Sequence, residues 1–264
     1  MIRPPRKAAK IAKGRQANLY AILLHSDVGV YIGITVSKVE IIPLGGIGEF
    51  GMNCMGIRYA DEMIIVDAGM GFPEETPYGV DISIPNFDFL EEYREDLTAI
   101  ILTHGHEDHI GALTYILKKY NLPVYSSRFT LALCEKRLGE HDMLDDVLLH
   151  RVKAGDRIKL GHFEIEFIHA SHSLVECFSL AIHTPVGTII HTGDYKIDDT
   201  PVIGKPYDLE MLGRIGDEGV LALLCDSTNA TVPGRTPCCR RRRRGRGASR
   251  RCGGRAAGLS PRTR

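Results

Sequence analysis

Long hydrophobic runs are missing from this chain of 264 residues. No stretch reaches about eighteen consecutive apolar residues, the length that a membrane-spanning helix requires, so we expect no membrane span. The N-terminus also lacks the apolar core and small-residue cleavage site of a secretory signal peptide. Cysteine occurs seven times, an odd number, and never as a C-x-x-C pair. These absences favour reduced thiols and a cytoplasmic location.

Acidic residues are absent from both ends of the chain. Residues 1–25 contain six basic side chains and residues 235–264 contain twelve arginines, with no acid in either segment. Setting those eighteen aside leaves fifteen basic against thirty-three acidic residues in the rest, although the formal net charge of the chain is zero. The sequence therefore combines an acidic body with two basic ends, a division that indicates separate origins or separate roles.

The densest group of potential metal ligands lies in residues 103–109, with the sequence Thr-His-Gly-His-Glu-Asp-His. Imidazole and carboxylate ligands suit zinc best among the common metals. An apolar run at 98–102 predicts a buried strand before the group, and apolar residues at helical spacing over 110–117 predict a helix after it. Such a loop can direct alternate side chains to two neighbouring points, as a two-metal site needs. The alternative is a histidine-rich surface loop, but a chance cluster of histidines is not expected between a buried strand and the start of a helix.

Three further predicted strands end in residues of the same kinds. Asp67 follows one, His169 and His172 follow the next, and Asp194 follows the third. Asp67 would either act in catalysis or brace the histidine loop, and we favour the brace. One such cluster could lie on a solvated surface by chance. A series of them at successive strand ends argues instead for a shared site.

The glycine-rich stretch 44–53 has four glycines within seven residues, which permits positive φ angles and close backbone approach. No lysine and no helical pattern follow, so we interpret it as a tight loop that borders the site rather than as a phosphate-binding loop. Apolar patterns predict the other elements. The expected strands are 55–59, 63–66, 123–125, 163–168, 178–183, 188–191 and 220–225, and the expected helices are 87–93, 130–138 and one from about 109 to 120.

Taken in order, these ligand-type residues resemble the pattern of the metallo-β-lactamase superfamily. Between residues 38 and 236 the chain is similar, more narrowly, to the bacterial ribonuclease J family of the β-CASP branch. The stretches that carry this resemblance are 44–53 (LGGIGEFGMN), 102–111 (LTHGHEDHIG), 180–188 (LAIHTPVGT), 191–196 (HTGDYK) and 226–230 (DSTNA), with Pro233 and Gly234.

The resemblance implies a centre that holds two Zn²⁺ ions. Its ligands would be His104, His106 and His172 for one ion, Asp108 and His109 for the other, and Asp194 for both. Asp108, His109 and Asp194 would be the catalytic residues, and Asp194 would orient the attacking hydroxide and accept its proton. The choice of His172 over His169 rests on the family's spacing to the HTGD motif. Asp67 and Asp226 would support the site.

The fold that the resemblance implies is α/β, a four-layer αβ/βα sandwich in which two mixed β-sheets face each other with helices outside. The site would lie at one edge, where strand ends converge, and the strand 220–225 would complete a central position ending at Asp226. Members of the family cut RNA as 5′-to-3′ exonucleases and as endonucleases in RNA processing and decay. The intact family is cytoplasmic and homo-oligomeric, with no membrane partner.

The resemblance stops after Thr236, where an arginine-rich tail replaces the β-CASP domain and its further histidine ligand. We therefore expect three parts: 1–36, a disordered or mis-started extension; 37–234, the N-terminal part of an incomplete metallo-β-lactamase domain; and 235–264, an unstructured tail, either out-of-frame translation or a nucleic-acid-binding arm. On this expectation the second zinc site is incomplete and nuclease activity is weak or absent.

Two other functions stay open. A small-molecule metallo-hydrolase of the same fold, of thioesterase or lactamase type, is one, although the DSTNA stretch at 226–230 argues against it. A non-catalytic RNA-binding remnant that acts through its basic tail is the other.

Overall fold

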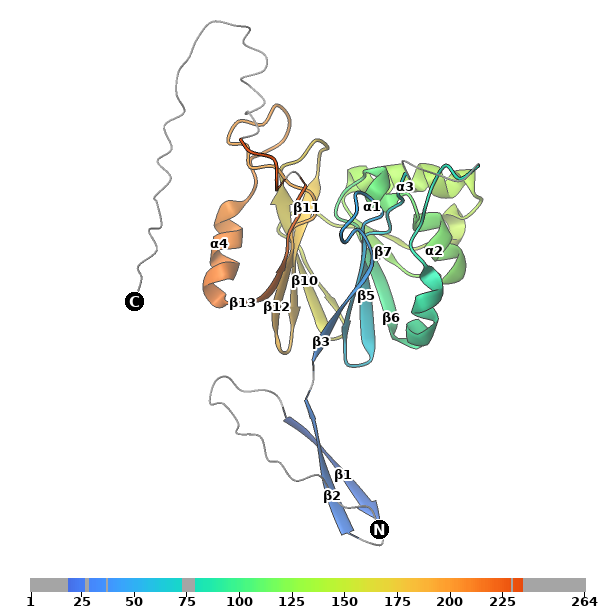
Figure 1. Cartoon of the computed structure of the whole chain (residues 1–264), viewed down its shortest axis with the longest axis vertical. Helices are drawn as coiled ribbons and strands as arrows, with labels where there is room; N and C mark the ends of the chain where they lie inside the picture. Colours follow the sequence, from blue (N-terminus) through green and yellow to red (C-terminus); the bar gives the residue numbers. More distant parts are fainter. Residues whose placement is uncertain (1–18, 27–28, 37, 73–78, 229, 235–264) are drawn as a thin grey trace, which may run out of the picture.

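The computed structural model describes residues 19–26, 29–36, 38–72, 79–228 and 230–234. From residue 39 onward the described chain forms two β-sheets that face each other, with helices on the outer side of each sheet (Figure 1). The predicted four-layer sandwich of mixed sheets is confirmed. None of the described helices is long and apolar enough to cross a membrane.

The first large sheet has the strand order β3-β4-β5-β6-β7-β8. Its strands are β3 (Val39–Gly45), β4 (Cys54–Tyr59), β5 (Glu62–Val66), β6 (Leu97–Ile101), β7 (Val124–Ser126) and β8 (Leu149–Arg151). Pairing is antiparallel from β3 to β5 and parallel from β5 to β8. Strands β5 and β6 each end in three buried apolar residues because both faces of this sheet are covered.

The second large sheet has the order β13-β12-β11-β10-β9. Its strands are β9 (Arg157–Leu160), β10 (Phe163–Ala170), β11 (Cys177–Thr184), β12 (Gly187–His191) and β13 (Val220–Leu224). The prediction of a central position for the last strand is wrong: among the described residues, β13 is the edge strand and pairs in parallel with β12 alone. Its apolar run misled the interpretation: Leu221 and Leu223 are 56% and 61% exposed, whereas Ala222 and Leu224 pack inward.

The helices cover the outer faces of the two sheets. They are η1 (Phe87–Asp96, a 3₁₀ helix), α1 (Glu107–Ile110), α2 (Leu113–Lys119), α3 (Arg128–Glu140), η2 (Leu144–Asp146, also 3₁₀) and α4 (Leu209–Glu218). The single helix predicted from about 109 to 120 is two helices, interrupted at Gly111 and Ala112. Because α1 begins at Glu107, Asp108 and His109 lie on a helical turn.

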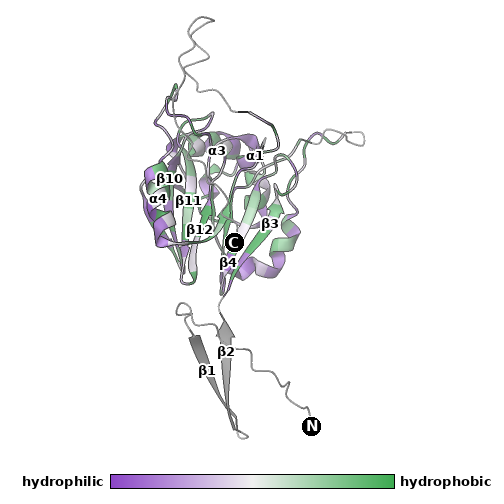
Figure 2. Ribbon diagram, turned by 60° about the vertical axis from the view of Figure 1, so that its left-hand side comes forward, coloured by the Kyte–Doolittle hydropathy of each residue, from purple (hydrophilic) through white to green (hydrophobic). Residues whose placement is uncertain are grey.

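The core between the sheets fixes the relative positions of the strand ends. Ile57, Ile64 and Ile101 from one sheet meet Phe163 and Phe167 from the other, and all five are fully buried. Burying each such side chain contributes roughly 1.5–3 kcal/mol. Figure 2 shows apolar colouring along the strands, whereas the outer helices α3 and α4 carry hydrophilic residues. The sandwich is therefore held by apolar contacts that lie beside the converging strand ends.

Strands β1 (Leu19–Ser26) and β2 (Gly29–Val36) form an antiparallel hairpin that the sequence did not predict. Within the described chain this hairpin pairs with neither large sheet. Residues 1–18 and the arginine-rich tail 235–264 lie outside the described residues. The division of the chain into an extension, a domain and a tail stays a prediction.

Candidate metal centre

The candidate site lies at one edge of the sandwich, where three strands end close together. His104 and His106 follow β6, His172 follows β10, and Asp194 follows β12. The loop after β6 continues directly into α1, so Asp108 and His109 reach the same edge. The strand ends that the sequence analysis singled out therefore converge on one small volume.

Four of the predicted ligands form what we call the three-histidine group: His104, His106, His172 and Asp194. The Nε2 of His104 and the Nδ1 of His106 are 2.9 Å apart, and the same Nδ1 is 3.2 Å from the Nε2 of His172. Oδ2 of Asp194 lies 3.7 Å from the Nε2 of His172. One ligand atom from each residue lies within 4.8 Å of all the others.

The remaining predicted ligands form a second cluster, the helix-turn group of Asp108, His109 and Asp194. The Nε2 of His109 lies 3.3 Å from Oδ1 of Asp194 and 3.7 Å from Oδ2 of Asp108. Asp194 thus presents one carboxylate oxygen to each group. A carboxylate in this position can bridge two cations.

Asp67 lies beneath the loop and is almost fully buried. Its Oδ1 accepts the backbone N–H of Thr103 at 2.7 Å, and its Oδ2 lies 2.7 Å from Nδ1 of His109. This contact directs Nδ1–H of His109 to the carboxylate and leaves Nε2 to face the cluster. The geometry is that of the brace which the sequence analysis favoured for Asp67.

Asn53, at the end of the glycine-rich loop, was not among the predicted site residues. Its Nδ2 donates to the backbone carbonyl of Asp108 at 3.2 Å and lies 3.1 Å from Nε2 of His109. Its backbone N–H also donates to the Asp108 carbonyl, at 2.9 Å. The sequence placed this loop beside the site, but nothing in the spacing distinguished the asparagine from the glycines around it.

The backbone supports the helix turn directly at Gly69. A Cβ built at this glycine would lie 1.7 Å from the carbonyl oxygen of Asp108. No side chain fits in that space without displacing the turn. Glycine is required here for close approach between two backbone segments.

Two other candidate residues lie outside both ligand groups. Nε2 of His169 lies 3.0 Å from the carbonyl oxygen of Lys205, and this histidine joins neither cluster. The carboxylate of Asp226 accepts the backbone N–H of Thr228 at 2.8 Å. In the described part of the chain, Asp226 makes no hydrogen bond to a site histidine, so its predicted supporting role stays a prediction.

The pKa values of the candidate site residues are shifted in different directions. Burial, reinforced by the neighbouring His109 imidazole, lowers the pKa of His104 to about 2, and burial also lowers the pKa of His172. Burial alone would lower the pKa of His109, but the Asp67 and Asp194 carboxylates raise it to about 10. Burial opposes ionisation of Asp194, yet the hydrogen bond from His109 holds its pKa well below the usual range. The neutral imidazole, the form that binds metals, is therefore favoured at His104 and His172.

The donor set fits zinc. Two nitrogens that each lie about 2.0–2.1 Å from a tetrahedral Zn²⁺ are roughly 3.3 Å apart. The measured nitrogen separations of 2.9 and 3.2 Å are close to that value. Three imidazoles and one carboxylate also match the ligand types that Zn²⁺ prefers.

Known proteins are similar to this chain in sequence and in fold. A family model of the metallo-beta-lactamase superfamily matches residues 47–215. Ribonuclease J of Synechocystis is 44% identical over 201 residues, which are 75% of this chain and 31% of that protein. Ribonuclease J of Helicobacter pylori is 42% identical over 230 residues, which are 86% of this chain and 33% of that protein. The chain therefore spans about a third of the length of these curated relatives.

Among solved structures, a protein of unknown function from Enterococcus faecalis superposes with a TM-score of 0.52 at 18% identity. The match covers 76% of this chain and 52% of that protein, and it supports the fold alone. With the family match over residues 47–215 and the convergence of the ligand residues, the chain belongs to the metallo-beta-lactamase superfamily, within which it is similar to ribonuclease J.

Proposed function

We propose that this chain carries the metal centre of a zinc-dependent ribonuclease of the ribonuclease J type, which hydrolyses RNA phosphodiester bonds. The observation that carries the proposal is the position of Asp194, whose two carboxylate oxygens face two separate ligand groups. The similarity to proteins named ribonuclease J supports RNA as the substrate class. Exonuclease and endonuclease action, RNA processing, a cytoplasmic location and homo-oligomeric assembly belong to the same proposal.

His104, His106, His172 and Asp194 would hold one Zn²⁺, and Asp108, His109 and Asp194 would hold the second. A bound zinc pair lowers the pKa of water and neutralises developing charge on a phosphate. The protein's own contribution is to fix the ligands before substrate arrives. Asp67 and Asn53 perform this task for the helix-turn group, because both hydrogen-bond to its members from outside the cluster.

Asp194 would also move the proton. Its carboxylate lies between the two groups, and the hydrogen bond from His109 keeps it ionised. An ionised carboxylate at this point can orient an attacking water and accept its proton. Ser173, whose Oγ lies 3.0 Å from Nε2 of His106, would hold that ring in its orientation.

The proposal is tested by adding Zn²⁺ to the purified chain and offering three substrates: single-stranded RNA, a thioester and a β-lactam. We expect cleavage of RNA that a chelator abolishes and that Asp194→Asn removes. Asp145→Asn is the matched control, because Asp145 is an exposed carboxylate outside the site. Hydrolysis of the thioester or the lactam in preference to RNA would contradict the proposal. The sequence predicts that nuclease activity is weak or absent, and the same assay measures its level.

A further inference from the structure

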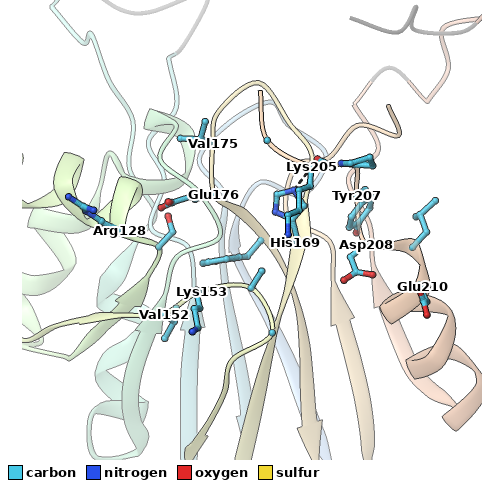
Figure 3. Close-up of a pocket in the computed structure, with 17 residues that line it drawn as sticks. Arg128, Val152, Lys153, His169, Val175, Glu176, Lys205, Tyr207, Asp208 and Glu210 are labelled. Atoms are coloured by element: carbon cyan, nitrogen blue, oxygen red, sulfur yellow. Dashed lines mark hydrogen bonds between the residues drawn. The ribbon is translucent and has the colours of Figure 1, made fainter. Parts of the chain in front are cut away.

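A cavity lies on the other side of the loop that contains His172. This cavity has a volume of about 830 Å³, and none of the six candidate ligands lines it. Its walls come from the start of α3, the turn before β9, the end of the His172 loop and the segment before α4 (Figure 3). Val175 and Glu176 belong to the same loop as His172, so one loop separates the cavity from the candidate metal centre.

Apolar and aromatic side chains form part of the lining. Phe178 and Tyr207 are 2% and 7% exposed. The hydroxyl of Tyr207 lies 2.6 Å from Oγ of Ser179, which is fully buried, so the polar end of the tyrosine is satisfied inside the protein. What Tyr207 offers the cavity is its ring. The small exposed part of this ring gives the cavity an apolar contact for a planar ligand group.

A hydrogen-bonding histidine stands on the same wall. Nε2 of His169 faces the carbonyl oxygen of Lys205 at 3.0 Å and therefore donates to it (Figure 3). In the neutral tautomer, Nδ1 is then left as an acceptor. The wall thus combines an aromatic side chain with a histidine ring, and both kinds of group contact nucleobases.

Three cations also border the cavity: Arg128, Lys153 and Lys205. Within the described chain, none of these side chains takes part in a hydrogen bond or ion pair, whereas two of the three lining carboxylates are engaged by helix ends. Glu176 accepts the backbone N–H of Phe129 in the first turn of α3, and Asp208 accepts that of Met211 at the start of α4. The three cations can therefore contact an anionic ligand, and they balance the charge of the three carboxylates that line the same cavity.

We propose that this cavity binds one nucleotide unit, with its base against Tyr207 and its phosphate held by Lys153 and Lys205. The unit is either a free nucleoside monophosphate or one residue of an RNA strand. The assignment deepens the proposed function and rests on it for the choice of RNA, but binding here needs neither the cluster nor hydrolysis. The cavity is also large enough for a nucleotide to enter without rearrangement of the fold.

The test measures binding of AMP to the whole chain by calorimetry and by ¹H–¹⁵N shifts, in the presence of a chelator so that the metal centre contributes nothing. Adenosine and inorganic phosphate are measured in parallel, and a five-nucleotide oligoadenylate separates a strand from a free nucleotide. We expect AMP to bind at least about tenfold more tightly than either fragment, because base and phosphate contacts both contribute. Binding of phosphate as tight as that of AMP, or no binding of any nucleotide, would overturn the proposal.

Two paired variants complete the test. The double variant Lys153→Ala, Lys205→Ala is expected to weaken AMP binding at least about tenfold. The control Lys118→Ala, Lys159→Ala removes the same charge from exposed positions outside the cavity and is expected to leave the affinity unchanged. Equal losses in both would assign the binding to general electrostatics. His104→Ala should abolish RNA hydrolysis yet keep AMP binding, so failure of either proposal is recognised separately.

Discussion

The two ligand groups that share Asp194 are built in different ways. The three-histidine group draws its members from loops after β6, β10 and β12, which meet only because the two sheets pack together. The helix-turn group takes two of its three members from a single turn of α1, held from below by Asp67 and from the side by Asn53. One group therefore depends on the packing of the two sheets, and the other depends on one helical turn and on the two residues that hold that turn. The first also offers four ligands and the second three.

Replacing Asp194 tests whether the groups act as one centre. Asp194→Asn removes the only ligand that both contain, so zinc binding and RNA hydrolysis should fall together. The loss should exceed about 100-fold, the upper range for residues that act only on a ligand from outside. Calorimetric zinc titration and an RNA cleavage assay measure it. If only one zinc is lost, Asp194 does not bridge.

Single-group substitutions distinguish the two affinities. His172→Ala should remove the tighter of two zinc ions and Asp108→Ala the weaker, because four ligands hold a cation more strongly than three. At zinc concentrations high enough to fill both groups, the zinc content of each variant should fall from about two to about one per chain. Competition with a chromophoric chelator gives both affinities. Loss of the same ion in both variants would show that the groups are not independent.

The brace affects only its own group. Asp67→Asn leaves the side chain's shape but weakens the contact with Nδ1 of His109. Zinc affinity at the helix-turn group should fall about 10–100-fold, the usual effect of removing an outer partner of a histidine ligand. The three-histidine group should be almost unaffected. A uniform loss at both sites, with a lower melting temperature, would instead indicate damage to the fold.

A charged cluster away from the edge provides the smallest effect and a control for fold stability. Glu166 is 4% exposed and contacts Arg157, Arg214 and His183. Glu166→Gln should lower the unfolding free energy by about 1 kcal/mol, since both arginines are partly exposed. Zinc binding should not change. Urea unfolding and zinc titration of the same preparation check both statements.

The pH dependence of that difference has a definite sign. Burial raises the pKa of Glu166, but hydrogen bonds from His183 and Arg157 outweigh it and hold the pKa below its ordinary value. The ionised carboxylate therefore stabilises the fold above its unfolded-state pKa of about 4.3. This contribution is lost as pH falls through the lower folded-state pKa. The difference between wild type and Glu166→Gln should be constant near neutrality and should vanish in strong acid.

Much of the fold and most of the candidate site could be predicted from local sequence patterns. The apolar run of β6 and the alternation of β10 are local signals, and the ligand-type residues follow them directly. The break between α1 and α2 was missed because helical spacing continues across Gly111. The edge position of β13 was missed because an apolar run does not reveal how many neighbours a strand has. Asn53 was missed because its role depends on a carbonyl fifty-five residues away.

The close approach at Gly69 means that a substitution outside the ligand set can disturb the candidate metal centre. The carbonyl of Asp108 rests against this residue with no space between them for even a methyl group. The substitution Gly69→Ala would alter no ligand and no charge, yet it would displace the helical turn that contains Asp108 and His109. Such a variant would keep every metal-binding side chain, but Asp108 and His109 would no longer be held in position by the backbone at residue 69.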